Sequence, residues 1–182
     1  MSLNLQPTLQ NQKAILYPLH PTDFEELYLA ASNPKTWEQH PNPDRYKREV
    51  FAVFFKGAIA SEGAFKIVDK ASDAVIGSTR FYDYNPQTDS ILIGYTFYSP
   101  HYWGKGYNSL VKASMLNYIF QFVSTVYFHV GSQNLRSQIA ITKLGAQKIA
   151  EKEVAYFGEA TKLNFVYQIT KQNWLEQSKT II

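Results

Sequence analysis

The sequence contains no cysteine at all. This absence excludes disulfide bonds, thiol catalysis and cysteine-ligated metal sites, and it fits a reducing compartment. No apolar run approaches the roughly 20 residues that a membrane-spanning helix needs. The first dozen residues have neither the basic start nor the apolar centre of a signal peptide. Together these absences predict a soluble cytoplasmic protein with no membrane association.

A strong charge of either sign is also missing. The chain carries 18 basic and 15 acidic residues, which leaves a net charge of +3 and no run rich in Lys or Arg. Nucleic-acid binding is therefore not indicated, although one local site for an acidic ligand is compatible with this balance. The four histidines are scattered and match no metal-ligand spacing, so no metal site is expected.

Aromatic side chains are what the chain has in quantity. Its 182 residues include 13 Tyr and 12 Phe, and 45% are hydrophobic, which is enough to fill a core or to line a pocket. A chain of this length usually forms one domain. We expect a loosely ordered N-terminal segment at residues 1–12 and a single domain at residues 13–182.

The pattern of the first half predicts a succession of strands and helices. Residues 90–98 form a nearly continuous apolar run, which is typical of a central strand buried on both faces. A glycine inside a strand often marks a bulge, and Gly94 lies inside this run. The other expected elements are a strand at residues 13–19, a helix at 20–32, a proline-rich loop at 33–44, a helix at 45–61, and a hairpin of strands at 63–69 and 74–84.

A helix is predicted after the central strand, because apolar residues recur at helical spacing between residues 107 and 122. A second buried-looking strand follows at 124–130, and a strand–helix–strand unit of this length implies a right-handed crossover between parallel strands. The predicted fold class is a mixed α/β sheet, mostly antiparallel, with one central parallel β-α-β crossover and flanking helices. The remaining expected elements are a helix at 134–145, strands at 146–157 and 161–170, and a short C-terminal helix.

Two glycines, Gly104 and Gly106, stand immediately before the predicted central helix. The first N–H groups of a helix lack internal partners, and with the helix dipole they favour an anion. Glycine lets the chain wrap closely around such a ligand, while Lys105 adds charge and Ser109 adds a hydroxyl. The pattern is neither a P-loop nor a Rossmann fingerprint. On these residues alone, a diphosphate-binding site and a plain turn into a core helix are equally supported.

The wider order of elements resembles the GNAT acetyltransferase superfamily. Its phosphate loop, Gln/Arg-x-x-Gly-x-Gly/Ala, corresponds to residues 101–106, and the segment YWGKGY is most similar to the RimJ/RimL-like branch of ribosomal-protein N-acetyltransferases. A second signature, an Asn-x-x-Ser helix start that ends in Lys-Leu-Gly, matches Asn134, Ser137 and residues 143–145. The similarity extends over residues 14–169.

The resemblance implies acetyl-CoA as the acyl-donor co-substrate. By position, the pantetheine arm would pair with the end of the central strand at Phe97, Tyr98 and Ser99, and Asn134 would hydrogen-bond the same arm. The catalytic groups would be a backbone N–H near Tyr98, for the oxyanion, and Ser137, for the leaving thiolate. The pyrophosphate would lie on the loop and the first helical turn, formed by His101, Trp103, Gly104, Lys105, Gly106, Tyr107, Asn108 and Ser109.

The sequence departs from the family pattern at several positions. His101 replaces the usual Gln or Arg, Asn108 replaces a small residue, and Leu92 stands where many relatives carry a glutamate. Ile141 occupies the position of a tyrosine that many GNAT proteins use. The sequence therefore dictates no general base. An α-amino acceptor, with a pKa of about 8, needs less help than a lysine near 10.4.

The acceptor site is expected at Trp37, Glu38 and His40, in the loop after the first helix, and at Asp83, at the end of a hairpin strand. A solvated loop, a hydrophobic anchor and ordinary strand-end residues are the alternative interpretations of these positions. His129, late in the second parallel strand, is either a core histidine or a group that faces the reactive centre.

The expected function is transfer of an acetyl group from acetyl-CoA directly to a primary amine, either a protein N-terminus or a small amine. A non-catalytic sensor or scaffold that binds acyl-CoA is the alternative, and the missing strand glutamate is its main support. Both a monomer and a homodimer are compatible with the sequence.

Overall fold

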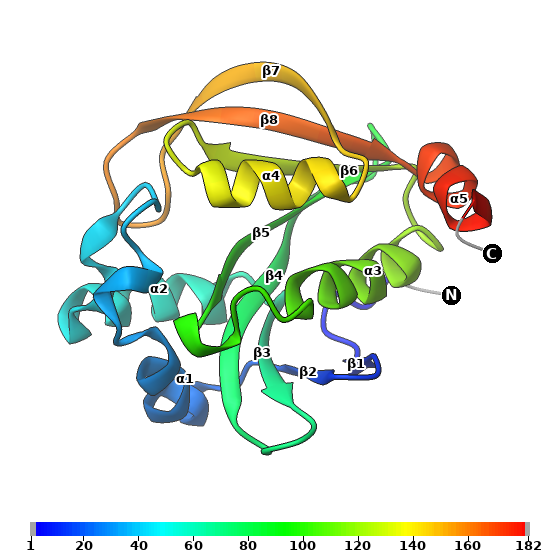
Figure 1. The fold of residues 1–182 in the computed structure, drawn as a ribbon. Coiled ribbons are helices and arrows are strands. Elements are labelled where there is room, and N and C mark those ends of the chain that lie inside the picture. The colour runs from blue at the N-terminus through cyan, green and yellow to red at the C-terminus, as the bar shows by residue number, and fades with distance from the viewer. Residues whose placement is uncertain (1–2, 181–182) are drawn as a thin grey trace.

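The computed structural model describes residues 3–180 and contains one 8-stranded sheet with the order β1-β2-β3-β4-β5-β6-β8-β7 (Figure 1). Neighbouring strands are antiparallel except β5 and β6, which pair in parallel from Ser90↔Thr125 to Leu92↔Tyr127. This arrangement confirms the predicted mixed sheet with one parallel crossover. The strands are β1 (Leu9–Gln10), β2 (Ala14–Pro18), β3 (Ala64–Asp69), β4 (Val75–Asn85), β5 (Ser90–Tyr98), β6 (Thr125–Gly131), β7 (Gln147–Val154) and β8 (Lys162–Thr170).

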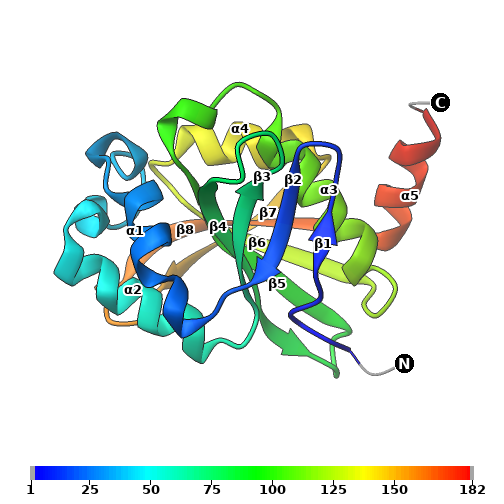
Figure 2. The ribbon, with the colours of Figure 1, turned by 90° about the horizontal axis from the view of Figure 1, so that it is seen from below.

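Helices cover both faces of the sheet. α1 (Phe24–Ala31) and α2 (Arg48–Ala60) lie on one face, and α3 (Tyr107–Ile119) and α4 (Leu135–Lys143) lie on the other, as Figure 1 and Figure 2 show from two directions. α5 (Lys171–Thr180) follows β8 directly. None of the helices within residues 3–180 has the length and apolar character of a transmembrane span. Four short 3-10 turns each begin with a proline, whose fixed φ suits the first helical position: Pro21–Asp23, Pro34–Thr36, Pro43–Tyr46 and Pro100–Tyr102.

Each face of the sheet has its own apolar core. The core beneath α3 and α4 is largely aliphatic and includes Ile91 of β5. The core beneath α1 and α2 is aromatic. Both Phe54 and Phe97 pack against Trp37, Phe51 and each other, with ring centroids 4.8 to 6.1 Å apart. Ring pairs at these separations add to the stabilisation from burial. Phe97 therefore ties β5, the strand that lines the site, to the α1–α2 layer.

Residues 3–12 of the N-terminal segment, for which loose order is predicted, lie against the rest of the fold, and residues 1–2 lie outside the described residues. Residues 9–10 pair with β2 as strand β1, and the side chains of Leu3, Leu5 and Leu9 pack against the core beneath α3. Tyr118 Oη of α3 donates a 2.7 Å hydrogen bond to the carbonyl of Asn4. The physical reason is the alternation of leucines among polar residues, because one apolar face is enough to hold an extended segment against a helix.

A bulge in β5 shapes the centre of the molecule. Ser78 and Arg80 of β4 pair with Phe97 and Gly94, so β5 carries one residue more than β4 in this stretch. Tyr95, at the bulge, has a φ of +52°, which a non-glycine residue adopts rarely. The guanidinium of Arg80 lies 3.8 Å from the centroid of the Tyr95 ring and helps to hold this conformation. Parallel pairing with β6 ends before the bulge, and the two strands separate beyond it.

Candidate active site

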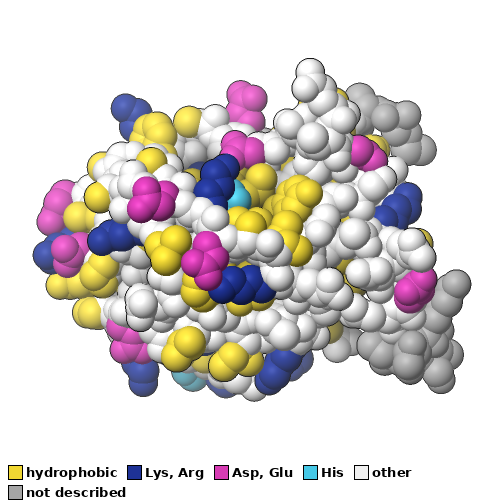
Figure 3. Space-filling view, turned by 90° about the horizontal axis from the view of Figure 1, so that it is seen from above, with side chains coloured by type: hydrophobic (Ala, Val, Ile, Leu, Met, Phe, Trp, Pro, Cys, Tyr) yellow, Lys and Arg dark blue, Asp and Glu magenta, His cyan; other side chains and the backbone are white. Residues whose placement is uncertain are grey.

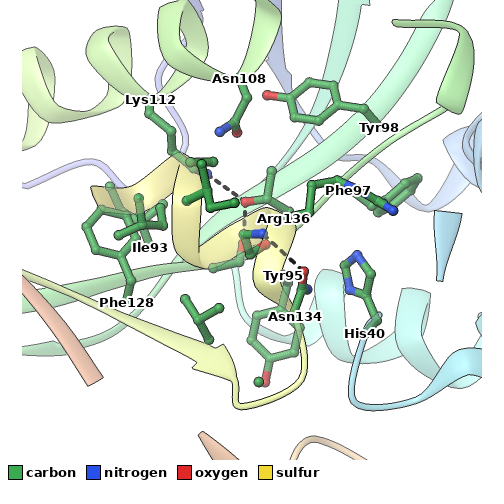
Figure 4. Close-up of a pocket in the computed structure, with 18 of the residues that line it drawn as sticks. His40, Ile93, Tyr95, Phe97, Tyr98, Asn108, Lys112, Phe128, Asn134 and Arg136 are labelled. Atoms are coloured by element: carbon green, nitrogen blue, oxygen red, sulfur yellow. Dashed lines mark hydrogen bonds between the residues drawn. The ribbon is translucent and has the colours of Figure 1, made fainter. Parts of the chain in front are cut away.

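A cavity of about 470 Å³ lies between β5 and β6 where the two strands separate. Its walls come from the bulged half of β5, the loop before α3, the start of α3, the end of β6 and the start of α4 (Figure 4). From above, the surface shows a recess in which hydrophobic side chains and a histidine are visible beside basic side chains (Figure 3). The predicted site residues that line the cavity are His40, Phe97, Tyr98, Trp103, Gly104, Gly106, Tyr107, Asn108, Ser109, Asn134 and Ser137.

The loop before α3 has the backbone that its glycine pair was expected to allow. Gly104 and Gly106 have φ values of +71° and +82°, and Gly106 is the N-cap of α3. A Cβ on Gly104 would meet no heavy atom within 4 Å, so space is open beside it. Ser109 Oγ donates to the Gly106 carbonyl at 3.0 Å, and Lys13 Nζ donates to the Lys105 carbonyl at 2.6 Å. These bonds fix the loop and leave the N–H groups of the first helical turn available to an anion.

Tyr107 fastens the start of α3 to the sheet. Its Oη donates a 2.6 Å hydrogen bond to Oδ1 of Asp69, at the end of β3. This bond raises the pKa of Tyr107 to about 12 and lowers the pKa of Asp69. The phenol therefore stays protonated and the carboxylate stays ionised across the neutral range, and the position of the helix N-terminus is fixed by β3 as well as by β5.

Trp103 and Arg136 connect two walls of the cavity. Trp103 Nε1, in the loop before α3, donates a 3.0 Å hydrogen bond to the carbonyl of Tyr98. The guanidinium of Arg136, on α4, lies 3.7 Å from the centroid of the Trp103 ring and donates a 2.8 Å hydrogen bond to Glu38. Arg136 therefore joins three segments, because α4 contacts both the loop before α3 and the loop after α1 through this one side chain.

Three of the residues predicted to bind acetyl-CoA, Ser99, His101 and Lys105, do not line the cavity. The N–H of Ser99 donates to the carbonyl of Ile76 on β4 at 2.8 Å. His101 and Lys105 are exposed, with 3.5 Å between His101 Nε2 and Lys105 Nζ. The structure therefore presents the backbone of this loop to the cavity, rather than the charge of Lys105.

Asn134 and Ser137 reach the cavity from the start of α4. Asn134 Oδ1 accepts the N–H of Ser137 at 3.1 Å, which makes Asn134 a side-chain N-cap. Because its oxygen is engaged, the side chain has its Nδ2 donors left for a ligand. The Asn-x-x-Ser spacing thus serves the helix and brings the Ser137 hydroxyl to the cavity wall.

Trp37 lies behind the cavity wall rather than in it. Its side chain is fully buried, and its Nε1 donates a 2.7 Å hydrogen bond to the carbonyl of Ala31. Its ring packs against the rings of His40 and Phe97, at centroid distances of 5.0 and 4.8 Å. The indole therefore supports two residues that do line the cavity.

The other predicted acceptor-site residues are also separated by the fold. Glu38 is the exposed partner of Arg136, and Asp83 is exposed at the end of β4. His40 is the member of this predicted set that lines the cavity. Burial, with the positive charges of Arg45 and Arg136, lowers the pKa of His40 well below its usual value, so its imidazole is neutral at physiological pH.

Three buried polar atoms of the cavity wall have no hydrogen-bond partner among the described residues: Thr36 Oγ1, Tyr98 Oη and His129 Nδ1. Buried polar groups are normally paired, so these atoms indicate where a ligand would bind. The Tyr98 hydroxyl points toward Asn108, on the side of α3 (Figure 4). Burial raises the pKa of Tyr98, and the hydroxyl is therefore a neutral hydrogen-bond donor.

The charges around the cavity are of one sign. Within the described part of the chain, no Asp or Glu lines it, whereas the basic residues Arg45, Arg136 and Lys143 do, together with Lys112, whose burial disfavours its charged form. The described residues also contain no cluster of His, Asp and Glu that could hold a metal ion. An extended ligand with an anionic end fits this wall, and the phosphates and amide-containing arm of CoA have that chemistry.

Lys112 is a cavity residue that the sequence analysis missed. It is 2% exposed, and its Nζ donates to Thr79 Oγ1 at 2.8 Å and to Thr96 Oγ1 at 2.6 Å. Burial lowers its pKa to about 7. Its place on the apolar face of α3, at helical spacing from the buried Met115 and Ile119, was the signal that could have found it.

Arg45 and Tyr156 also line the cavity, and no pattern in the sequence indicates that they do. Arg45 is 3% exposed and makes a two-point ion pair with Glu159, at 2.7 and 2.6 Å. Tyr156 Oη donates a 2.6 Å hydrogen bond to Asn164 on β8. Arg45 belongs to a 3-10 turn before α2, and Tyr156 to the loop after β7, so only the folded chain brings them together.

A bulged central strand, a parallel neighbour that separates from it and a helix start that suits an anion are the features expected of a CoA-binding α/β acyltransferase. A sequence model of the acetyltransferase (GNAT) domain matches residues 13–147, which is most of the chain. The chain therefore belongs to the GNAT acetyltransferase family, whose members use acetyl-CoA, and it is an acetyl-CoA-dependent acetyltransferase.

Solved structures share this fold at low sequence identity. A GCN5-related N-acetyltransferase from Brucella melitensis matches with a TM-score of 0.78 and 18% identity, over 97% of this chain and 85% of that one. RimJ from Mycobacterium smegmatis, in complex with CoA-disulfide, matches with a TM-score of 0.68 and 15% identity, over 91% and 87%. FdhC, a nucleotide-linked sugar GNAT, matches with a TM-score of 0.72 and 17% identity, over 97% of both chains. The expected similarity to a RimJ-type structure is thus confirmed at the level of the fold.

Proposed function

We propose that this protein transfers the acetyl group of acetyl-CoA directly to a primary amine, either a protein N-terminus or a small amine, without a covalent enzyme intermediate. The observation that carries this proposal is the cavity itself. It runs from the N-terminus of α3, which suits a pyrophosphate, to the bulge of β5, and its wall contains partner-free polar atoms. The chain has no cysteine that could carry the acetyl group.

Backbone geometry supports the predicted role of Tyr98. Successive residues of a strand point their N–H groups to opposite edges, and the N–H of Ser99 donates to β4. The N–H of Tyr98 therefore points to the opposite edge, on which the cavity lies. In this proposal it stabilises the oxyanion of the tetrahedral intermediate, while the first turn of α3 binds the pyrophosphate and Asn134 Nδ2 donates to the pantetheine arm.

The transfer needs an unprotonated amine at one end and a stabilised thiolate at the other. The amine nitrogen attacks the thioester carbonyl carbon, the C–N bond forms, and the C–S bond breaks with its electron pair on sulfur. The Ser137 hydroxyl would donate its proton to this sulfur and take up the N–H proton that the attacking amine loses, so that the products are the amide and CoA thiol.

An acceptor screen tests the proposed function. Purified protein with acetyl-CoA and a panel of peptide N-termini, polyamines and amino sugars should release CoA thiol, and mass spectrometry should detect one acetylated amine. Binding of acetyl-CoA without transfer to any acceptor would instead favour an acyl-CoA sensor. No binding of CoA in calorimetry would exclude both functions.

Replacing Ser137 with alanine should lower kcat by about 10-fold, because the thiolate loses a hydrogen-bond donor in the transition state. The Kd of CoA should stay within about twofold, since the N-cap bond uses the backbone of residue 137 rather than its hydroxyl. Ser132→Ala, just before α4 and outside the cavity, is the control and should leave both values unchanged. A kcat equal to that of the unmodified protein would remove Ser137 from the mechanism.

A further inference from the structure

His129 occupies the wall of the cavity that faces the bulge of β5. Parallel pairing of the two strands ends at Leu92↔Tyr127. Gly94 and His129 each lie two residues beyond this last pair, so they are level with each other and on the face of the sheet that Leu92 and Tyr127 share. Gly94 immediately precedes Tyr95, the residue of the bulge. An amine entering at the bulge would therefore meet the His129 side chain on the opposite strand.

The imidazole of His129 is in the chemical state that a base requires. Its Nδ1 is buried and has no hydrogen-bond partner within residues 3–180. Burial and the charge of Lys152 on β7 lower the pKa of His129, and Asp83 on β4 opposes them in part. The titratable side chains that line the cavity with it are Lys, Arg, Tyr and His40, and in the described part of the chain none of them is a carboxylate. The ring is thus neutral, with the Nδ1 lone pair free when Nε2 carries the proton.

The composition of the wall narrows the choice of base further. No Asp or Glu lines the cavity in the described part of the chain. His40 is the other histidine there, but its ring packs edge-on against Trp37, and the charges of Arg45 and Arg136 act against its protonation. At His129, burial and the charge of Lys152 lower the pKa, whereas the carboxylate of Asp83 raises it and so favours the protonated imidazole.

We propose that His129 is the general base that takes the proton from the acceptor amine; this inference rests on the proposed acetyl transfer. An acceptor that arrives as an ammonium gives one proton to Nδ1. The neutral nitrogen then attacks the thioester carbonyl carbon, the N–C bond forms and the C–S bond breaks. The second N–H proton ends on the CoA thiolate, through Ser137, and His129 releases its proton to solvent.

His129 would also compensate for the residue at position 92. Position 92 of β5 is leucine, and the side chain of Leu92 cannot accept a proton. His129 lies on the same face of the sheet as Leu92, on the neighbouring strand β6. In this proposal the base is thus supplied by β6 rather than by β5.

The test compares His129→Asn with the unmodified protein on the best acceptor from the screen and on methoxyamine, a very weakly basic primary amine. We expect kcat on the screened acceptor to fall by about 30-fold or more, since general bases contribute at least this much. The KM for acetyl-CoA should change by less than about threefold. The loss on methoxyamine should be much smaller, because this amine is already unprotonated at pH 7 and needs no base to remove a proton before it attacks. The acid limb of the kcat/KM profile, below about pH 6.5, should disappear in the variant.

The controls separate a base from a structural residue. His129→Gln provides a second variant in case asparagine disturbs β6, and Tyr127→Phe changes the same face of β6 outside the cavity. Calorimetric binding of CoA verifies that each variant is folded. Equal losses on both acceptors, a retained acid limb or a kcat within about threefold of the unmodified protein would overturn the role of His129. Absence of transfer by the unmodified protein would overturn the proposed function itself.

Discussion

Replacing Gly104 with valine should weaken CoA binding by about 100-fold or more. Gly104 has a φ of +71°, and a β-branched residue is strongly disfavoured there. The loop must therefore either keep a strained backbone or change its conformation. A change of conformation would redirect the N–H groups that the loop and the first turn of α3 offer to an anion. A Cβ at this position meets no protein atom within 4 Å, so it would project into the open space where we propose that the pyrophosphate binds. Isothermal titration calorimetry with CoA measures the effect.

Two further variants of the loop before α3 distinguish the contribution of its backbone to CoA binding from that of its charged side chain, Lys105. Gly104→Ala should have an intermediate effect, because alanine tolerates a positive φ better than valine does. Lys105→Met keeps the glycine backbone and removes a charge that lies outside the cavity, so its Kd should change by only about threefold. Normal CoA affinity in Gly104→Val would show that the loop is a plain turn, and a larger effect of Lys105→Met would place the affinity in the side chain.

The thermal stability of Gly104→Val is a necessary companion measurement. Strain at one residue costs about 1–2 kcal/mol, which lowers the Tm of a chain of this length by a few degrees. A loss of binding in a variant that remains folded at the assay temperature therefore reports on the ligand site. A collapse of the Tm would instead mean that the loop is needed for the α3 contact with Asp69.

The parallel crossover could be predicted because its signals are local. Continuous apolar runs mark β5 and β6, and helical spacing marks α3 between them. The glycine pair likewise encodes its own backbone, since positive φ values at Gly104 and Gly106 need no help from distant residues. These features depend on the periodicity and the conformational freedom of neighbouring residues.

The details of the cavity were less predictable because they depend on contacts between distant segments. Gly94 indicated the bulge, but the residue with the positive φ is Tyr95, which the Arg80 guanidinium and the rings of Tyr82 and Tyr156 hold in place. Nothing in the loop after α1 tells whether Trp37 faces the acceptor or the core. The aromatic core decides this, because a fully buried indole gains more from packing than a cavity wall offers.

Replacing Lys112 with methionine should stabilise the protein by about 2 kcal/mol or more at pH 7. Burial lowers the pKa of Lys112 from 10.5 to about 7, which means that the folded state disfavours the charged amine. Methionine is unbranched and fills the same space without that cost. The hydroxyls of Thr79 and Thr96 lose a donor but keep their own hydrogen bond of 2.8 Å.

The pH dependence distinguishes this explanation from a general packing effect. Between pH 7 and 10.5 the unfolded chain holds the proton and the folded chain does not, so the stability of the unmodified protein rises with pH through this window. The advantage of methionine should therefore be greatest at and below pH 7 and should shrink toward pH 10. Urea unfolding at pH 7 and pH 9.5 measures both differences. Lys35→Met, on an exposed turn, should change stability by less than about 0.5 kcal/mol at either pH. A destabilised Lys112→Met protein would mean that the ammonium is charged and favourably bound, and that the two threonine hydroxyls offset its desolvation.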